Sequence, residues 1–303
     1  MCRFLLLIPL LLLVSEAAAL NERSSPTLQG DSWPDVKERG SGTLIAVYVP
    51  AEGFAWHSGI DSHSRDNAPA HKEKLTGVTV DLLREFTRYL SETYDIELDL
   101  SFERQKHWPT FYKDMVDAGD GVIGMGNVTI TEERCRELVF SPPYMTNIAS
   151  LITHHNAPEL IEPEHLKTTL GGRTALAFEG TLHEQRLRKL TGQYYPEASF
   201  RMAGSNDEIL GLVSASDQYF AYIDLYNYWR AVERGLPLRR HESADQASEQ
   251  FGYIMPLNTS WEPVLREFFE HADGLTASER YHSILSDHLG ENLARILLDA
   301  ATR

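Results

Sequence analysis

One short stretch combines small residues, hydroxyl groups and an arginine at a spacing that suits anion binding. Asn127, Thr129 and Thr131 follow an apolar, glycine-containing run, and Arg134 lies in a short charged helix after them. Backbone N–H groups at such a turn can donate to an anion, and a guanidinium can hold a carboxylate through two parallel hydrogen bonds. The residues alone leave two interpretations open: a carboxylate-binding turn, or an ordinary helix cap beside a solvated arginine.

Apolar runs and helical periodicity alternate along the first half of the chain and predict the elements that position this turn. We expect strands over 42–49, 96–102 and 121–126, and helices over 78–93 and 108–116. The first strand is apolar on both faces, as a buried strand of a parallel sheet should be. The order strand, helix, strand, helix, strand therefore predicts an α/β unit with a largely parallel sheet.

The second half of the chain repeats this α/β pattern. The predicted elements are strands over 150–153, 174–178, 219–223 and 251–255, and helices over 181–190, 207–213, 261–272 and 278–300. We expect the chain to leave lobe 1 (residues 43–149) near residue 150, to form lobe 2 (150–251), and to return with residues 252–303 completing lobe 1. Two crossings make a hinge, and ligands of open α/β sheets lie beyond the carboxyl ends of the strands.

Four stretches resemble, in the same order, the motifs of the family 3 bacterial extracellular solute-binding proteins, which are the receptors of amino-acid ABC importers. They are LTGVTVDL at 75–82, TITEER at 129–134 with VFSPPY at 139–144, FEGT at 178–181, and YID at 222–224. Phe251–Met255 resembles the return strand of that family. The resemblance implies a two-lobed periplasmic-binding-protein type II fold, each lobe an open, mostly parallel sheet flanked by helices.

The resemblance also implies a set of ligand-binding residues. A free amino acid presents a carboxylate and an ammonium, and each needs a partner when it is buried. Arg134 is then the carboxylate clamp, with Thr129, Asn127 and the Gly180–Thr181 turn completing the cradle. Leu182 stands where the family often has a second hydroxyl, which removes one expected carboxylate contact.

For the ammonium, the resemblance implies Asp224, at the carboxyl end of a strand; a carboxylate that only holds its own turn is the alternative. Phe54, Trp56 and Trp108 are candidates for aromatic walls, and each could equally belong to the core. Glu179 stands where a neutral residue is common, so it either favours a basic ligand or faces solvent.

The N-terminal sequence and the net charge limit the possible cellular location and binding partners. Residues 1–19 carry an early arginine, an apolar run and a small-residue cleavage site, which predicts a signal peptide and a periplasmic protein; a retained anchor is the alternative. Residues 20–42 are expected to form a flexible leader. The formal charge of −16 argues against nucleic acid and anionic membranes as partners.

Neither a disulfide nor a cofactor is expected. Cys135 is the only cysteine after the predicted cleavage site, so no internal disulfide can form. The loop from His57 to His71 holds three histidines and two aspartates, which could ligate zinc. Their spacing fits no compact metal motif, so we favour a solvated loop.

The leading functional hypothesis is a monomeric, non-enzymatic solute-binding protein that delivers a polar amino acid or similar small carboxylate to an inner-membrane ABC permease. A periplasmic dehydratase of prephenate-like acids on the same fold is an alternative, with Glu179 or Glu184 as general acid. A sensory module that presents its closed form to a receptor is another. A related domain heads membrane-bound murein lyases, but the sequence ends at Arg303, so we expect no lyase domain.

Overall fold

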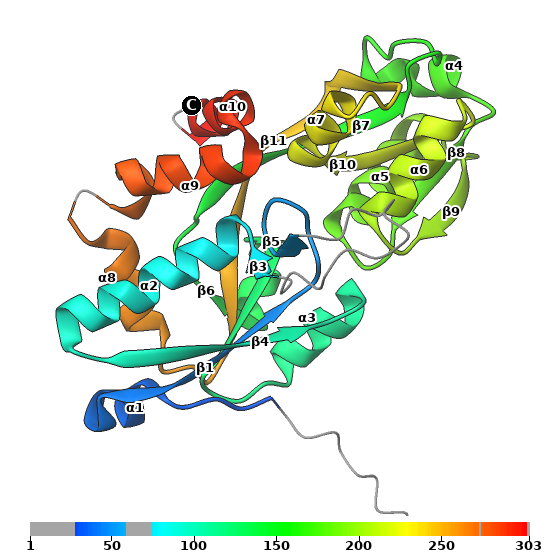
Figure 1. The fold of residues 1–303 in the computed structure, drawn as a ribbon. Helices are drawn as coiled ribbons and strands as arrows, with labels where there is room; N and C mark the ends of the chain where they lie inside the picture. The colour runs from blue at the N-terminus through cyan, green and yellow to red at the C-terminus, as the bar shows by residue number, and fades with distance from the viewer. Residues whose placement is uncertain (1–27, 59–73, 273, 302–303) are drawn as a thin grey trace, which may run out of the picture.

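The computed structural model describes residues 28–58, 74–272 and 274–301, which form two α/β lobes joined by long strands (Figure 1). One curled sheet runs through both lobes in the order β4-β1-β5-β11-β7-β10-β8-β9, and β6 pairs with β11 at its side. Helices flank the sheet in each lobe (Figure 1). The predicted two-lobed α/β fold is therefore confirmed.

Lobe 1 is built on a parallel sheet with an apolar core on each face. Its elements before the hinge are α1 (Trp33–Arg39), β1 (Ser41–Tyr48), β2 (Trp56–Ser58), β3 (Lys74–Thr76), α2 (Val78–Tyr94), β4 (Glu97–Arg104), α3 (Trp108–Val116), β5 (Val122–Thr129), the 3-10 turn η1 (Arg134–Arg136) and β6 (Leu138–Phe140). β1 pairs in parallel with β4 and β5. Because strand side chains alternate between faces, Leu44 and Ala46 join one core cluster while Ile45 and Val47 join the other.

Lobe 2 repeats this arrangement. Its elements are η2 (Pro163–His165), α4 (Leu166–Leu170), β8 (Thr174–Phe178), α5 (Leu182–Tyr194), β9 (Ser199–Ala203), α6 (Asn206–Ala215), β10 (Tyr219–Asp224) and α7 (Leu225–Glu233). β8 pairs in parallel with both β9 and β10. Ala175 and Ala177 face the core under α4 and α5, whereas Leu176 faces the core under α6.

Two antiparallel strands, β7 (Met145–His154) and β11 (Leu238–Pro256), carry the chain between the lobes. The first part of β11 pairs with β7, and its last part pairs with β5 and β6 of lobe 1. The β7–β11 register shifts twice, between His241 and Gln246 and again before Glu249. Such irregularities bend a strand pair, so this pair can serve as a hinge.

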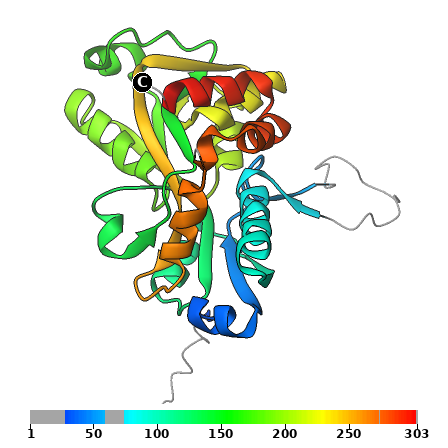
Figure 2. The same cartoon turned by 90° about the vertical axis from the view of Figure 1, so that its left-hand side faces the viewer.

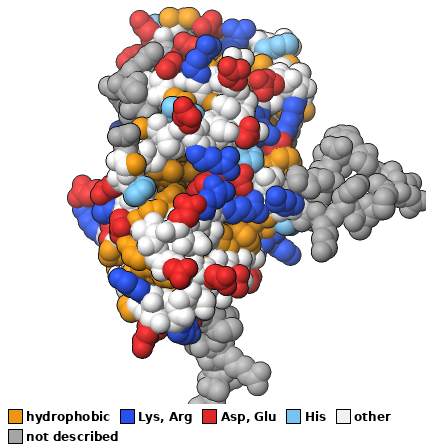
Figure 3. Space-filling model, turned by 60° about the vertical axis from the view of Figure 1, so that its left-hand side comes forward, with side chains coloured by type: hydrophobic (Ala, Val, Ile, Leu, Met, Phe, Trp, Pro, Cys, Tyr) orange, Lys and Arg blue, Asp and Glu red, His pale blue; other side chains and the backbone are white. Residues whose placement is uncertain are grey.

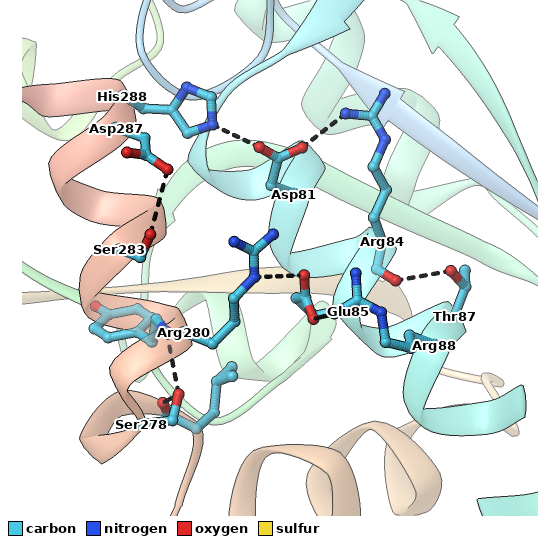
Figure 4. A network of polar contacts seen from close by, with 12 residues as sticks. Asp81, Arg84, Glu85, Thr87, Arg88, Ser278, Arg280, Ser283, Asp287 and His288 are labelled. Atoms are coloured by element: carbon cyan, nitrogen blue, oxygen red, sulfur yellow. Dashed lines mark hydrogen bonds and ion pairs between the residues drawn. The ribbon is translucent and has the colours of Figure 1, made fainter. Parts of the chain in front are cut away.

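The C-terminal helices α8 (Glu262–Glu270), α9 (Glu279–Leu289) and α10 (Glu291–Ala301), with η3 (Leu275–Ala277) between the first two, share the core cluster of β1 and α2. Figure 2 shows them, orange to red, beside α2 in cyan. Polar contacts join α9 to α2 (Figure 4): His288 lies 2.7 Å from Asp81, and Arg280 lies 2.8 Å from Glu85. The hydrogen bond from His288 is the main reason that the pKa of Asp81 lies below its ordinary value.

Several elements differ from the sequence-based expectation, and β9 and α7 were not expected at all. The expected leader, 20–42, contains α1, which Ser32 caps and Gly40 ends in a left-handed conformation (φ 73°), and which buries Val36. The expected helix over 278–300 is divided at Gly290, where φ is 81°. β11 extends far beyond 251–255, because its first part is polar and lacks the expected alternation.

No helix within the described ranges is both long enough and apolar enough to cross a lipid bilayer. The predicted signal peptide, residues 1–19, lies outside the described residues, and so does most of the His57–His71 loop.

Candidate functional site

Arg134 lies beside the junction of the lobes, in the turn η1 that follows β5. Its Nη1 donates to the carbonyl oxygen of Thr129 at 3.1 Å, and its guanidinium lies over the rings of Trp108 and Tyr112 at 5.7 and 5.6 Å. Burial is the main cause of the lowered pKa of Arg134. Among the described residues, no aspartate or glutamate forms an ion pair with this arginine. A half-buried guanidinium with unused donors is suited to an external carboxylate.

Trp108 joins the two lobes directly over this region. It opens α3 in lobe 1, and its indole Nε1 donates to the carbonyl oxygen of Gly180 in lobe 2 at 3.1 Å. Gly180 has a φ of 73°, and a Cβ at this position would lie 3.2 Å from Cγ of Pro109. Glycine therefore serves both the left-handed turn and the close approach of the lobes.

The Gly180–Thr181 turn uses its N–H groups within lobe 2. The N–H of Gly180 donates to the carboxylate of Glu184 at 3.0 Å, and the N–H of Thr181 donates to the carbonyl of Phe178 at 3.3 Å. The hydroxyl of Thr181 also donates to Phe178, at 2.8 Å. Contact of this turn with a ligand carboxylate thus stays a prediction, and it requires these donors to change partner.

Asp224 ends β10 and is only 8% exposed. Its Oδ1 accepts from Nδ2 of Asn147 at 2.6 Å and lies 3.2 Å from Nε2 of His183. Nδ2 of Asn147 also donates to Oε2 of Glu249 at 3.3 Å. Arg186 closes the group, because it pairs with Glu249 and lies 3.2 Å from Nδ1 of His183. We call these five residues the polar ring.

Sequence reasoning missed four members of the polar ring: His183, Arg186, Asn147 and Glu249. They come from α5 and from the two hinge strands, so no local spacing links them to Asp224. The available signals were a histidine and an arginine three residues apart on one helix, and polar residues within apolar strand surroundings.

Asn127 and Phe54 contact α7 of lobe 2. Asn127 has a positive φ of 51°, accepts from the hydroxyl of Tyr144 at 2.8 Å and donates to the hydroxyl of Tyr226 at 3.2 Å. Burial raises the pKa of both tyrosines. Phe54 is fully buried, and its ring centroid lies 4.5 Å from that of Tyr226. Asn127 thus bridges the lobes, and Phe54 packs in the core in this conformation.

A third contact between the lobes is ionic. Glu52, in the turn after β1, pairs with Arg230 of α7 at 2.6 Å and also with Arg234, which directly follows α7. Nη1 of Arg230 donates to the carbonyl of His288 in α9 at 3.5 Å. On the face shown in Figure 3, basic side chains gather at mid-height with acidic ones among them, although the chain as a whole carries a charge of −16.

The two walls of the junction differ in electrostatic character. Lobe 1 offers the guanidinium of Arg134, whereas the polar ring holds two carboxylates against one guanidinium. Burial lowers the pKa of Arg186, and the charge of Arg134 lowers it further, so the two guanidinium groups interact. A molecule with one anionic and one cationic group would match both walls.

The structure gives the surroundings of the two carboxylates considered as a catalytic acid. Glu184 accepts from Gly180 and pairs with Arg188 at 2.9 Å, and Glu179 is exposed to solvent. No group of three or more histidine, cysteine, aspartate or glutamate side chains within residues 28–58, 74–272 and 274–301 could hold a metal ion.

Solved structures of other proteins share this fold. An ancestral arginine-binding protein bound to arginine aligns with a TM-score of 0.64 and 16% identity, over 82% of this chain and 98% of that chain. The arginine-, lysine-, histidine-binding protein ArtJ from Geobacillus stearothermophilus aligns with a TM-score of 0.61 and 19% identity, over 82% and 95%. At these identities the likeness shows the fold.

One curated relative is a larger enzyme. The membrane-bound lytic murein transglycosylase F of Maricaulis maris (strain MCS10) is 25% identical over 181 residues, which is 60% of this chain but only 34% of that protein. This chain thus spans about a third of that relative's length. Residues 62–291, most of the chain and nearly all of both lobes, match the bacterial extracellular solute-binding proteins, family 3, and the protein belongs to that family.

Proposed function

We propose that this protein is a periplasmic solute-binding protein that captures a polar α-amino acid or a similar small carboxylate between its lobes and delivers it to an ABC importer of the inner membrane. The observation that carries the proposal is Arg134, a half-buried guanidinium at the lobe junction with no acidic partner among the described residues. The names of the structural neighbours, which include arginine-binding proteins, support the same class of ligand.

In this proposal the ligand bridges the lobes. Its carboxylate binds Arg134, with Thr129 and Asn127 beside it, and its ammonium approaches Asp224. Lobe 1 is residues 43–149 with 252–303, and lobe 2 is residues 150–251. The ligand shifts the population from open to closed by binding both walls, and the closed form is the one that the permease recognises.

The test is a thermal-shift screen of the twenty amino acids and of small mono- and dicarboxylates, followed by calorimetry. A ligand at a hundred times its dissociation constant should stabilise the folded state by about 2.7 kcal/mol. We expect an α-amino acid or a related carboxylate to do so and to be recovered chemically unchanged. If no carboxylate raises the melting temperature, the proposal is wrong; if a new product forms, the protein is an enzyme.

Export is part of the proposal, because an importer receptor works outside the inner membrane. Cleavage of the signal peptide would leave a soluble monomer that begins near Leu20. Mass spectrometry of the protein from the periplasmic fraction should find this N-terminus. Recovery of an uncleaved chain in the membrane fraction would contradict it.

A further inference from the structure

The polar ring is a closed cycle of contacts that includes two buried carboxylates, those of Asp224 and Glu249. Arg186 contacts Glu249 and His183, His183 contacts Asp224, and Asn147 contacts both Asp224 and Glu249. Asn147 is fully buried, and the other neutral or acidic members are at most 8% exposed. Buried carboxylates are stable only when each has hydrogen-bond donors, and the cycle supplies them.

The partners fix the protonation pattern within the ring. A guanidinium can only donate, so Nδ1 of His183 must accept from Arg186 at 3.2 Å. The proton of the imidazole is then on Nε2, 3.2 Å from Oδ1 of Asp224. These contacts fit the neutral Nε2–H tautomer of His183, with which the ring keeps one net negative charge. The side-chain oxygen of Asn147 is buried and accepts no hydrogen bond from any described residue.

The orientation of Asn147 follows from the same logic. Its amide group lies between two carboxylates, and only the NH2 end can donate to both. It therefore holds the carboxylate of Asp224 on one side and that of Glu249 on the other. An excess of acceptors and one net negative charge match a group with several donors and a positive charge, such as an ammonium.

The ring also connects Asp224 to the hinge. Asn147 and Glu249 are directly opposite each other on β7 and β11, and β10 pairs with β7 through Asp224 and Ala149. His183 and Arg186 lie in the first two turns of α5, next to the Gly180 turn that contacts Trp108 of lobe 1.

We propose that His183, Arg186, Asn147 and Glu249 are positioning residues: they hold the carboxylate of Asp224 in place for a ligand ammonium and thereby set the preference for α-amino acids over the same acids without the amino group. This inference rests on the proposed function and adds the origin of its ligand selectivity. The four residues act through Asp224 and need no contact with the ligand.

The test compares two substitutions of His183 with opposite expected effects. Glutamine can accept from Arg186 and donate to Asp224, as the neutral imidazole does, whereas leucine can do neither. Affinities are measured by calorimetry for two matched pairs: L-arginine with 5-guanidinopentanoate, and L-glutamine with glutaramate. We expect the wild type to prefer the amino acid, His183→Gln to keep that preference within about threefold, and His183→Leu to lose about tenfold or more of it.

Nitrogen NMR of the uniformly labelled wild type provides a readout that needs no ligand. The resonances missing from His183→Gln identify His183, and we expect shifts typical of the neutral Nε2–H tautomer near pH 7. A doubly protonated ring, or the Nδ1–H tautomer, would overturn the inference. Amide spectra of both variants check that the fold is retained, and where His183→Leu does not fold, Glu249→Gln takes its place in the affinity measurements.

The outcomes separate this inference from the proposed function. If the wild type prefers the amino acids and His183→Leu keeps the full preference, the ring has no positioning role and the proposed function stands. If the wild type prefers the acids that lack an amino group, the inference is wrong and the protein is a receptor for plain carboxylates. If the wild type binds none of the four probes, the inference also fails, and the wider carboxylate screen decides the proposed function.

Discussion

Partial burial of the Arg134 guanidinium costs desolvation free energy, which must be offset by contacts with other groups. Its guanidinium is half-buried between two aromatic rings and has one backbone acceptor, at 3.1 Å from Nη1. Cation–π contacts offset part of the desolvation, and they leave the planar fork able to take a carboxylate. The sequence pointed to this residue because its motif is local, and it also offered Trp108 as an aromatic wall; the ring of Tyr112 was not predicted.

We predict that Arg134→Lys lowers ligand affinity strongly while the fold is retained. Lysine keeps the charge but loses the planar fork, and losing one partner of a desolvated charge pair costs roughly 2–5 kcal/mol of binding free energy. Arg136→Lys is the matched control, because Arg136 is exposed and Glu132 is its only ion-pair partner among the described residues. Calorimetry with the ligand from the screen measures both, and equal affinities of both variants would exclude Arg134 as the clamp.

Asp224→Asn should separate a receptor for amino acids from one for plain carboxylates. The substitution keeps the shape and removes the charge, so affinity for an α-amino acid should fall by about 2 kcal/mol or more. Affinity for the same acid without its amino group should change little or rise. Asp217→Asn, on the exposed approach to β10, is the control. Equal losses for both ligands, together with a lower melting temperature, would mean that Asp224 only holds its own surroundings.

His241 makes stability depend on pH. It is fully buried, its Nδ1 accepts from the N–H of Leu160 at 3.0 Å, and burial lowers its pKa to about 4. The unfolded chain takes up the proton below about pH 6.5, whereas the folded chain does not until about pH 4. The free energy of unfolding should therefore fall as pH drops through this window, by up to about 3 kcal/mol from this group.

Urea unfolding of the wild type and of His241→Gln between pH 4 and 7 tests this dependence. The variant is expected to be less stable at pH 7 but to lose less stability on acidification, so the difference between the two should shrink as pH falls. A difference that stays constant with pH would contradict a neutral buried imidazole.

At the scale of elements, periodicity predicted most of the sheet and its helices, and the misses have physical reasons. β1, α2, α3 and β8 are amphipathic or apolar segments within one lobe, and their sequences carry that pattern. β11 does not, because its first part is polar and it pairs both with β5 of lobe 1 and with β7, which runs between the lobes. α1 did carry its signals, Ser32 before Pro34 and Gly40 after Arg39, but the surrounding polar composition obscured them.

The residues of the candidate site also divide into those that local sequence patterns predicted and those that they did not. Asp224 at the end of β10 and Trp108 at the start of α3 lie where the sequence predicted them. The polar ring was not predictable, because its five side chains come from four elements that meet only after the lobes have folded. The spacing of residues along the chain can predict a local motif, but it cannot predict a closed cycle of contacts between residues far apart in sequence.

For the whole molecule, the proposed binding between the lobes makes affinity depend on the balance between open and closed forms. The contacts that cross the junction include Trp108 to Gly180, Asn127 to Tyr226, and Glu52 to Arg230 and Arg234. The ion pairs of Glu52 with Arg230 and Arg234 form between protein side chains and do not involve a ligand. When the binding-competent form is only partly populated, the apparent affinity falls by that fraction.

We predict that Glu52→Gln opens the lobes of the ligand-free protein. Loss of a partly exposed ion pair is worth about 1 kcal/mol, which corresponds to a roughly fivefold shift toward the open form and a similar loss of apparent affinity. Small-angle scattering should find a larger radius of gyration for the variant. Glu233→Gln, on the exposed end of α7, is the control; an unchanged radius and affinity for Glu52→Gln would show that this ion pair does not restrain the lobes.

Cys135 directly follows Arg134 in the turn η1, and it is exposed. The sequence has one other cysteine, Cys2, within the predicted signal peptide, so the mature chain would offer a single thiol beside the lobe junction. A maleimide dye attached there would experience new surroundings whenever the lobes move. The fluorescence intensity of the dye would then report binding, and fractions of cell metabolites could be screened for the natural solute without knowing its identity beforehand.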